Sequence, residues 1–101
     1  MMDKMLLQKA IAEMENYSPS KKKILSLLLN LEEGEEVIIS AKSLIKLSGL
    51  TMPTVYTALK ALQKDEIIVK NPSSPNSFKF NILNLEKIES SYNKKLAMME
   101  R

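Results

Sequence analysis

The spacing of apolar residues along the chain predicts five helices and three short strands. The first helix is expected over residues 3–17, with Asp3 as its N-cap. Ser18 and Pro19 are typical of a cap followed by the first helical position, and they start a second helix that reaches about residue 31. This second helix is apolar nearly all round, so we expect it to be the central buried helix.

Two further helices follow with a tight turn between them. A β-branched run predicts a strand at residues 37–39, and helices are predicted at residues 40–47 and 51–64. Gly49 suits the left-handed position that ends a helix. Such a pair of helices is typical of a helix-turn-helix. The predicted N-caps are Ser40 and Thr51, and the predicted buried face of the longer helix, at i, i+3, i+4 and i+7, is Val55, Ala58, Leu59 and Leu62.

The remainder of the chain predicts a hairpin and a final helix. Strands are expected at residues 67–69 and 78–80, separated by the polar turn 71–76. Asn84 is the predicted N-cap of a helix that continues to about residue 100. One stripe of that helix is apolar, at Leu85, Ile88, Tyr92, Leu96 and Met99.

This order of elements predicts an α+β fold that is mostly α: a winged helix-turn-helix with extra N-terminal and C-terminal helices. We expect a single domain over residues 1–101. Its core is predicted at residues 19–81, and the flanking helices at residues 3–17 and 84–100.

Composition excludes several kinds of chemistry. The 101 residues include no cysteine and no histidine. Disulfides, thiolate or imidazole metal ligands and triads with an imidazole base are therefore excluded. Only two glycines are present to shape a phosphate-binding loop. We therefore expect a protein that is not an enzyme and that uses no cofactor and no metal.

The charge balance gives a weak basic excess. Fourteen lysines and one arginine, Arg101, stand against 12 acidic residues, which leaves a net charge of +3. This excess is consistent with a nucleic-acid partner without requiring one. The longest apolar run, residues 24–31, is too short to cross a bilayer, and the N-terminus lacks the features of a signal peptide. We therefore expect a cytoplasmic protein without a membrane partner.

The segment LSGLTMPTVYTALKALQKDEIIV resembles the helix-turn-helix core of winged-helix bacterial regulators of the MarR, ArsR and PadR groups. The resemblance covers about residues 19–81, and it implies a DNA-binding regulator of bacterial, phage or plasmid origin. Glu66 departs from the family pattern, which usually has glycine there. A side chain at this position is costly if the backbone is left-handed.

The outward face of the helix at 51–64 is the candidate for reading DNA, because the first turns of such a helix point at base edges in the major groove. Threonine and tyrosine hydroxyls can bond phosphates or bases, and lysines can follow phosphates. The alternative is a plain amphipathic helix with a solvated face. The candidate DNA-binding residues are Thr51, Met52, Pro53, Thr54, Tyr56, Thr57 and Lys60, with Lys42 on the preceding helix and Lys70, Asn76 and Lys79 on the wing.

The only arginine lies at the end of the chain, so the bidentate contact of arginine with guanine is absent from the predicted reading elements. We therefore expect affinity that depends mainly on phosphate contacts, a steep salt dependence and a preference for A·T-rich duplex DNA. The run Lys21–Lys23 lies where a helix dipole disfavours cations. It suggests either a phosphate or acidic partner or a solvated charge run.

The two flanking helices carry more apolar surface than a compact winged helix needs, which favours a homodimer and a palindromic DNA site. The resemblance has the same implication, since ArsR-like and PadR-like proteins dimerise through such helices. The alternative is that both helices fold back on their own domain. No residue marks a small-molecule effector site. The candidate dimerisation residues are Leu7, Ile11, Met14, Leu85, Ile88, Tyr92, Leu96 and Met99.

These patterns favour a small dimeric winged-helix transcriptional regulator, most simply a repressor that binds double-stranded DNA sequence-specifically. A replication or partition protein of a plasmid or phage is the first alternative. The hairpin that ends Phe-Lys-Phe-Asn-Ile-Leu also resembles winged-helix replication initiators. The second alternative is a winged helix used as a protein-protein interaction module, which the modest net charge leaves open.

Overall fold

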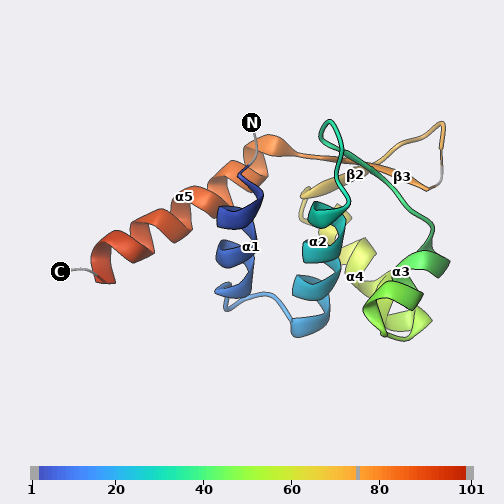
Figure 1. Ribbon diagram of the computed structural model, residues 1–101, viewed down its shortest axis with the longest axis horizontal. Coiled ribbons are helices and arrows are strands. Elements are labelled where there is room, and N and C mark those ends of the chain that lie inside the picture. The colour runs from blue at the N-terminus through green and yellow to red at the C-terminus, as the bar shows by residue number, and fades with distance from the viewer. Residues whose placement is uncertain (1–2, 75, 100–101) are drawn as a thin grey trace.

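The computed structural model describes residues 3–74 and 76–99. Pro75 in the predicted turn, and residues 100 and 101 at the predicted end of the last helix, lie outside the described part. Figure 1 shows the arrangement of the elements. They are α1 (Lys4–Ala12), α2 (Pro19–Asn30), β1 (Glu36–Ile38), α3 (Ala41–Ser48), α4 (Met52–Lys64), β2 (Ile68–Lys70), β3 (Ser77–Phe80) and α5 (Ile82–Met99).

The predicted fold class is confirmed: the described chain is mostly helical and carries a small antiparallel sheet. The sheet has the strand order β1-β3-β2, so the hairpin strand β3 lies in the middle. Val37 of β1 pairs with Phe78 of β3, and Lys70 of β2 pairs with the same phenylalanine from the other side. No helix in residues 3–74 and 76–99 is long and apolar enough to cross a membrane.

Three predicted N-caps are confirmed by side-chain hydrogen bonds. Asp3, Ser18 and Ser40 each accept from the backbone N–H three residues later. Thr51 occupies the N-cap position of α4 but makes no such bond. Its hydroxyl instead pairs with the hydroxyl of Thr54 at 2.8 Å.

Two predicted boundaries are wrong at the flanking helices. α1 ends at Ala12 rather than near residue 17, because the chain turns there and brings the Tyr17 ring into the core. α5 begins at Ile82, two residues before the predicted cap Asn84. The cap position belongs to Asn81, whose side-chain oxygen accepts from the Asn84 backbone N–H at 3.4 Å.

Helix α2 lies in the middle of the core, as predicted. It packs against α1, α3 and α4, and one of its faces is completely buried. The burial is not all round, because Leu27 is only partly buried and Lys23 and Asn30 are exposed. The fully buried residues of α2 are Ile24, Leu25, Leu28 and Leu29.

The flanking helices fold back on the same chain over part of their length. α1 packs between α2 and α5, and the side chains of Leu7, Ile11 and Leu85 are at most 1% exposed. The prediction that these three residues contact a second copy is therefore wrong, because their surfaces are already buried in the core of their own chain. Met14, Ile88 and Tyr92 are partly buried, whereas Leu96 and Met99 are exposed.

The turn after α4 is one of two places in the described backbone where a residue other than glycine has a positive φ, the other being Glu35. Glu66 has φ +58°, which is the left-handed conformation that side chains disfavour. Its N–H donates to Gln63 O and the next N–H, that of Ile67, donates to Leu62 O, each at 3.0 Å. This is the Schellman pattern that ends helices at a glycine. Asn84 of α5 holds the strained turn by donating to the Glu66 carbonyl oxygen at 2.8 Å.

The substitution Glu66→Gly should raise the free energy of unfolding by about 0.5–1 kcal/mol, because glycine adopts this backbone without a steric cost. Gly49→Ala is the matched control. Gly49 also has a positive φ of +71°, and a Cβ there would meet no atom within 4 Å. The free energy of unfolding of that variant should fall by about 1 kcal/mol, through backbone strain alone. Urea unfolding measures the change in the free energy of unfolding for both variants. A loss of stability in Glu66→Gly would contradict the conclusion that the backbone at Glu66 is strained.

Candidate nucleic-acid interface

Helices α3 and α4 form the predicted helix-turn-helix. Gly49, with its left-handed φ of +71°, ends α3. The buried hydroxyl of Ser48 accepts from the Leu50 N–H at 3.1 Å, which fixes the turn before α4. The buried face of α4 is the predicted one, at Val55, Ala58, Leu59 and Leu62. The opposite face is therefore free to meet a partner.

The outward face of α4 carries the predicted candidates. Met52 is 57% exposed and Tyr56 is 49% exposed, although both have large apolar surfaces. Exposed apolar groups beside hydroxyls suit base edges, where the thymine methyl group offers an apolar contact. The other candidates on this helix and its cap are exposed or half-exposed, at Thr51, Pro53, Thr54, Thr57 and Lys60.

Helix α4 and the wing border one cleft of about 490 Å³. Tyr56 and Lys60 reach it from α4, and Lys70 and Asn76 reach it from the hairpin. Four of the predicted DNA-binding residues thus meet around one concave surface, although they come from positions up to 20 residues apart in the sequence. The remaining lining residues are Ile39, Ala41, Leu59, Gln63 and Phe78.

Gln63 was not predicted as a site residue. Its half-buried side chain donates to the Leu59 carbonyl oxygen at 3.3 Å and lines the cleft beside Lys60. The sequence could have indicated Gln63, because it follows Tyr56 by seven residues and therefore lies on the same face of the helix. The amide can still offer hydrogen bonds to a base or a phosphate.

Lys79 lies outside this cleft. Side chains alternate between the two faces of a strand, and Phe78 and Phe80 on either side of Lys79 are buried against the core. Lys79 is therefore on the outer face of the sheet, where it pairs in register with Glu36 and Val69. Lys70 pairs in register with Phe78, so the two lysines face opposite sides of the wing, and DNA contact by Lys79 stays a prediction. Lys42 is exposed in the first turn of α3.

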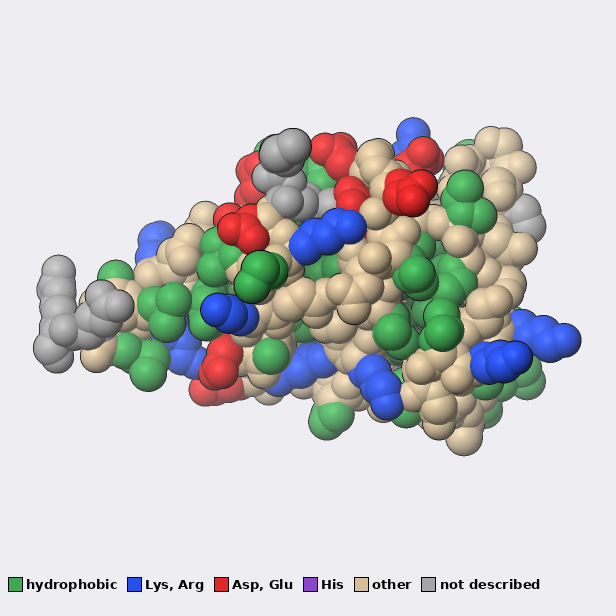
Figure 2. Space-filling view, viewed as in Figure 1, with side chains coloured by type: hydrophobic (Ala, Val, Ile, Leu, Met, Phe, Trp, Pro, Cys, Tyr) green, Lys and Arg blue, Asp and Glu red, His purple; other side chains and the backbone are tan. Residues whose placement is uncertain are grey.

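Positive charge is concentrated on the helix-turn-helix and the wing. Residues 37–80 contain six lysines and two acidic residues, whereas residues 1–36 contain five lysines and seven acidic residues. In Figure 2, acidic side chains gather at the upper edge, and lysines project at the right end near α3. The net charge of +3 therefore understates the positive charge of the helix-turn-helix and the wing.

Two lysines of the run Lys21–Lys23 have partners within the chain. Lys21 forms an ion pair with Asp65 at the end of α4, and its ammonium lies 3.7 Å from the centre of the Tyr17 ring. Lys22 donates to the Ala12 carbonyl oxygen at the end of α1 at 2.9 Å. These contacts explain why cations are tolerated in the first turn of α2. Lys21 also joins α2 to the end of α4 and so helps to fix the reading helix.

Tyr17 belongs to the same cluster. Its side chain is buried, and burial together with the nearby carboxylate of Asp65 raises the pKa of the Tyr17 phenol from 10.0 to about 12. The neutral phenol is therefore the form that the folded protein favours.

The described residues offer no evident metal site. In residues 3–74 and 76–99, no group of three or more acidic side chains is placed to hold a metal ion, and this includes the acidic turn after α2. There Glu32 accepts from the Glu35 N–H at 2.8 Å and pairs with Lys4 at 3.1 Å.

Comparisons with known proteins give one family and two structures. The family model described as Firmicute plasmid replication protein (RepL) matches residues 2–88. No curated protein sequence matches the chain significantly. The crystal structure of reduced CprK in the absence of any ligand is similar over 79% of this chain and 42% of that chain, with 24% identity and a TM-score of 0.47. Oxidized CprK in complex with o-chlorophenolacetic acid is similar over 80% of this chain and 37% of that chain, with 23% identity and a TM-score of 0.48. The chain thus spans about two fifths of the length of the CprK chains.

The Tyr17 cluster predicts a specific pH dependence. A group whose pKa is higher in the folded state contributes full stability below its unfolded pKa, near 10.0, and loses it as the pH rises through about 12. The free energy of unfolding should fall by at most about 3 kcal/mol over that window. Tyr17→Phe keeps the ring and leaves Lys21 and Asp65 in place, so it should remove the part due to the phenol. Urea unfolding at several pH values measures the free energy of unfolding of both proteins. If it depends on pH in the same way in both, the Tyr17 phenol is not the cause.

Proposed function

The chain belongs to the RepL family of Firmicute plasmid replication proteins, and from this premise we propose that it acts in plasmid replication by binding duplex DNA. The observation that carries the proposal is the shared cleft of α4 and the wing, where Tyr56, Lys60, Lys70 and Asn76 meet. A helix with an adjacent hairpin suits the major groove and the neighbouring sugar-phosphate backbone. The role is non-catalytic, and it requires neither a cofactor nor a metal.

In this proposal the first turns of α4 enter the major groove. Thr54, Tyr56 and Thr57 offer hydroxyl groups, and the side chain of Met52 offers an apolar surface to thymine methyl groups. Lys60 and Lys70 neutralise phosphates on either side of the cleft. Because residues 3–74 and 76–99 contain no arginine, direct recognition of guanine is weak and A·T-rich sites are favoured.

Two copies acting together would supply the specificity that one small reading face lacks. We extend the proposal to a homodimer on a palindromic site, in which each copy reads one half-site. The support is the apolar surface that α5 leaves exposed at Leu96, Met98 and Met99.

A transcriptional regulator, most simply a repressor, is the second candidate function. The helix-turn-helix favours it because the same reading face that binds an origin can occupy an operator. Family membership favours replication. Selecting the DNA sequences that the protein binds from a host genome and its plasmids distinguishes the two, because the selected sites will lie at an origin or at a promoter.

The double substitution Tyr56→Ala/Lys60→Ala should weaken duplex binding by about ten- to a hundredfold, because it removes one hydroxyl contact and one phosphate contact. The slope of log affinity against log salt should fall by about 1, as expected for one lost phosphate contact. Fluorescence anisotropy with a labelled duplex over a salt series measures both quantities.

The matched control is Lys9→Ala/Leu83→Ala, which also removes one lysine and one exposed apolar side chain, but from α1 and α5. Its affinity should equal that of the wild-type protein. Negligible binding of the wild-type protein to duplex DNA even at low salt would refute DNA binding and favour a protein-interaction module. Equal losses in both variants would place the interface elsewhere.

A further inference from the structure

The cleft between α4 and the wing has a floor that the proposed duplex contact leaves unused. We call this space, of about 490 Å³, the α4–wing cleft. Lys60 and Lys70 lie at its rim, where the proposed function places phosphates. Leu59 and Phe78 also line it, and they form its floor because only 6% and 5% of their surfaces are exposed. A charged phosphate loses hydration against such apolar groups, so the floor suits a different chemical group.

Tyr56 gives the cleft an aromatic wall. It lies in the second turn of α4, and 49% of its surface is exposed. An exposed aromatic ring beside lysines is the kind of platform on which single-stranded nucleic acids stack their bases. Every base has a flat face, so this contact requires no particular sequence.

Two amide groups line the same cleft. Gln63 reaches it from α4 and Asn76 reaches it from the hairpin. The Gln63 amide nitrogen donates to the Leu59 carbonyl oxygen at 3.3 Å, and its side-chain oxygen is an acceptor. The edge of an unpaired base carries both donors and acceptors, which amide groups can bond. The lining thus offers a partner for the face of a base and partners for its edge.

Ordered elements form this cleft, so it exists before any strand binds. The Ile39 N–H donates to the Asn76 carbonyl oxygen at 2.8 Å, which holds the hairpin against the segment before α3. Ala41 begins α3 beside it, after the Ser40 cap. The volume of the cleft lies within the range of about 300–1,000 Å³ that is typical of pockets for small organic groups.

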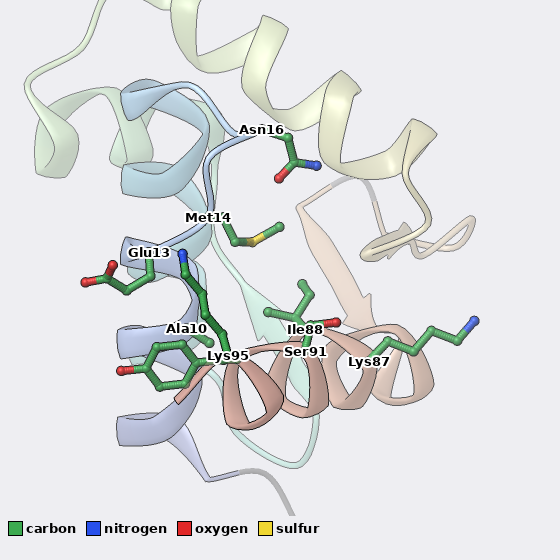
Figure 3. A pocket seen from close by; sticks show the side chains of 9 residues that line it. Ala10, Glu13, Met14, Asn16, Lys87, Ile88, Ser91 and Lys95 are labelled. Atoms are coloured by element: carbon green, nitrogen blue, oxygen red, sulfur yellow. The ribbon is translucent and has the colours of Figure 1, made fainter. Parts of the chain in front are cut away.

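A second cleft, of about 340 Å³ between α1 and α5, shows why charge matters. Met14 and Ile88 point toward each other across it, so its middle is apolar too (Figure 3). Glu13 also lines it, however, and Lys95 at its edge lies 3.7 Å from Glu15. Carboxylates repel a nucleic-acid strand. Among the described residues that line the α4–wing cleft, two are lysines and none is acidic.

We propose that the α4–wing cleft receives an unpaired base of single-stranded DNA, which stacks on the Tyr56 ring while Lys60 and Lys70 bind the flanking phosphates. A paired base cannot enter, because its faces are hidden in the stack of the duplex. The inference therefore goes beyond duplex binding and applies where a duplex has opened. The choice of DNA over RNA rests on the proposed function, which places the adjoining helix α4 on DNA.

An abasic strand tests whether a base enters the cleft. A thymidine oligonucleotide and an abasic oligonucleotide of the same length carry the same phosphates, but only the first has bases. The full chain should bind the thymidine strand about five- to a hundredfold more tightly, as expected when one base stacks on an aromatic ring. Fluorescence anisotropy at low salt measures both affinities. Equal affinities, or no binding of the thymidine strand, would overturn the proposal.

Substitutions of Tyr56 separate the effect of its ring from that of its hydroxyl group. Tyr56→Phe should keep the wild-type affinity for the thymidine strand, whereas Tyr56→Leu should weaken it by at least about fivefold. Tyr92→Leu is the matched control, because it removes the same ring from the cleft between α1 and α5 and should leave the affinity unchanged. Equal losses in Tyr56→Phe and Tyr56→Leu would show that the hydroxyl group makes the contact, and would overturn the stacking.

A substitution in the lining distinguishes the cleft from its rim. Ala41→Leu adds an apolar side chain to the cleft and removes no lysine, hydroxyl or amide group. It should weaken binding of the thymidine strand at least about fivefold more than it weakens binding of a duplex, because only the unpaired base needs the filled space. Ala12→Leu makes the same change at the exposed end of α1 and should alter neither affinity. Equal losses for strand and duplex in Ala41→Leu would overturn the inference.

Two further ligands separate this inference from the proposed function. Binding of duplex without binding of the thymidine strand overturns only the inference. Binding of the thymidine strand without binding of duplex overturns the proposed function and supports the inference. A uridine oligoribonucleotide should bind no more tightly than its deoxyuridine counterpart, and tighter binding of the RNA would overturn the choice of DNA.

Discussion

The burial of α2 is the constraint on which the rest of the structure depends. Leu25 and Leu28 are completely buried in the middle of the chain, so other elements must surround this helix. α1, α3 and α4 each pack against it, and the contact with α4 is the most extensive. Since α4 presents its apolar face to α2, its opposite face is directed to solvent. The reading surface is thus a consequence of how the central helix is covered.

A second set of contacts fixes the wing and α5 relative to the reading helix. α4 ends in the left-handed turn at Glu66, which leads directly into β2. Asn84 in the first turn of α5 binds the carbonyl oxygen of that turn. The ion pair of Lys21 with Asp65 joins the same region to the start of α2. The end of α4 is therefore tied to three elements, which places the wing beside the reading face and directs α5 away from it.

The two candidate surfaces at the ends of the molecule differ in physical character. The α4–wing cleft combines lysines with hydroxyl and amide groups, which suits a hydrated, negatively charged duplex. The exposed end of α5 at residues 96–99 and the cleft between α1 and α5 combine methionines with other apolar groups. The two ends of the molecule therefore differ in polarity.

By itself, the sequence determined the elements and the buried face of α4. Periodicity and capping residues such as Ser18, Ser40 and Gly49 act locally, so they predict helices before any packing is known. It also pointed to Tyr56 and Lys60, because these lie opposite a clear apolar stripe. The end of α1 at Ala12 was missed because it depends on a tertiary contact, the packing of Tyr17 into the core. The start of α5 at Ile82 was missed although its cap, Asn81, is a local signal.

Only the tertiary structure decided how apolar stripes are shared between the chain's own core and free surface. Leu7, Leu85 and Met99 look alike as members of helical stripes, yet the first two are buried and the third is exposed. Likewise, Lys70 and Lys79 are similar residues of one hairpin, but the register of β2 and β3 places them on opposite faces. Periodicity shows which residues need to be covered. What covers them depends on where other helices and strands lie in space, which no local pattern encodes.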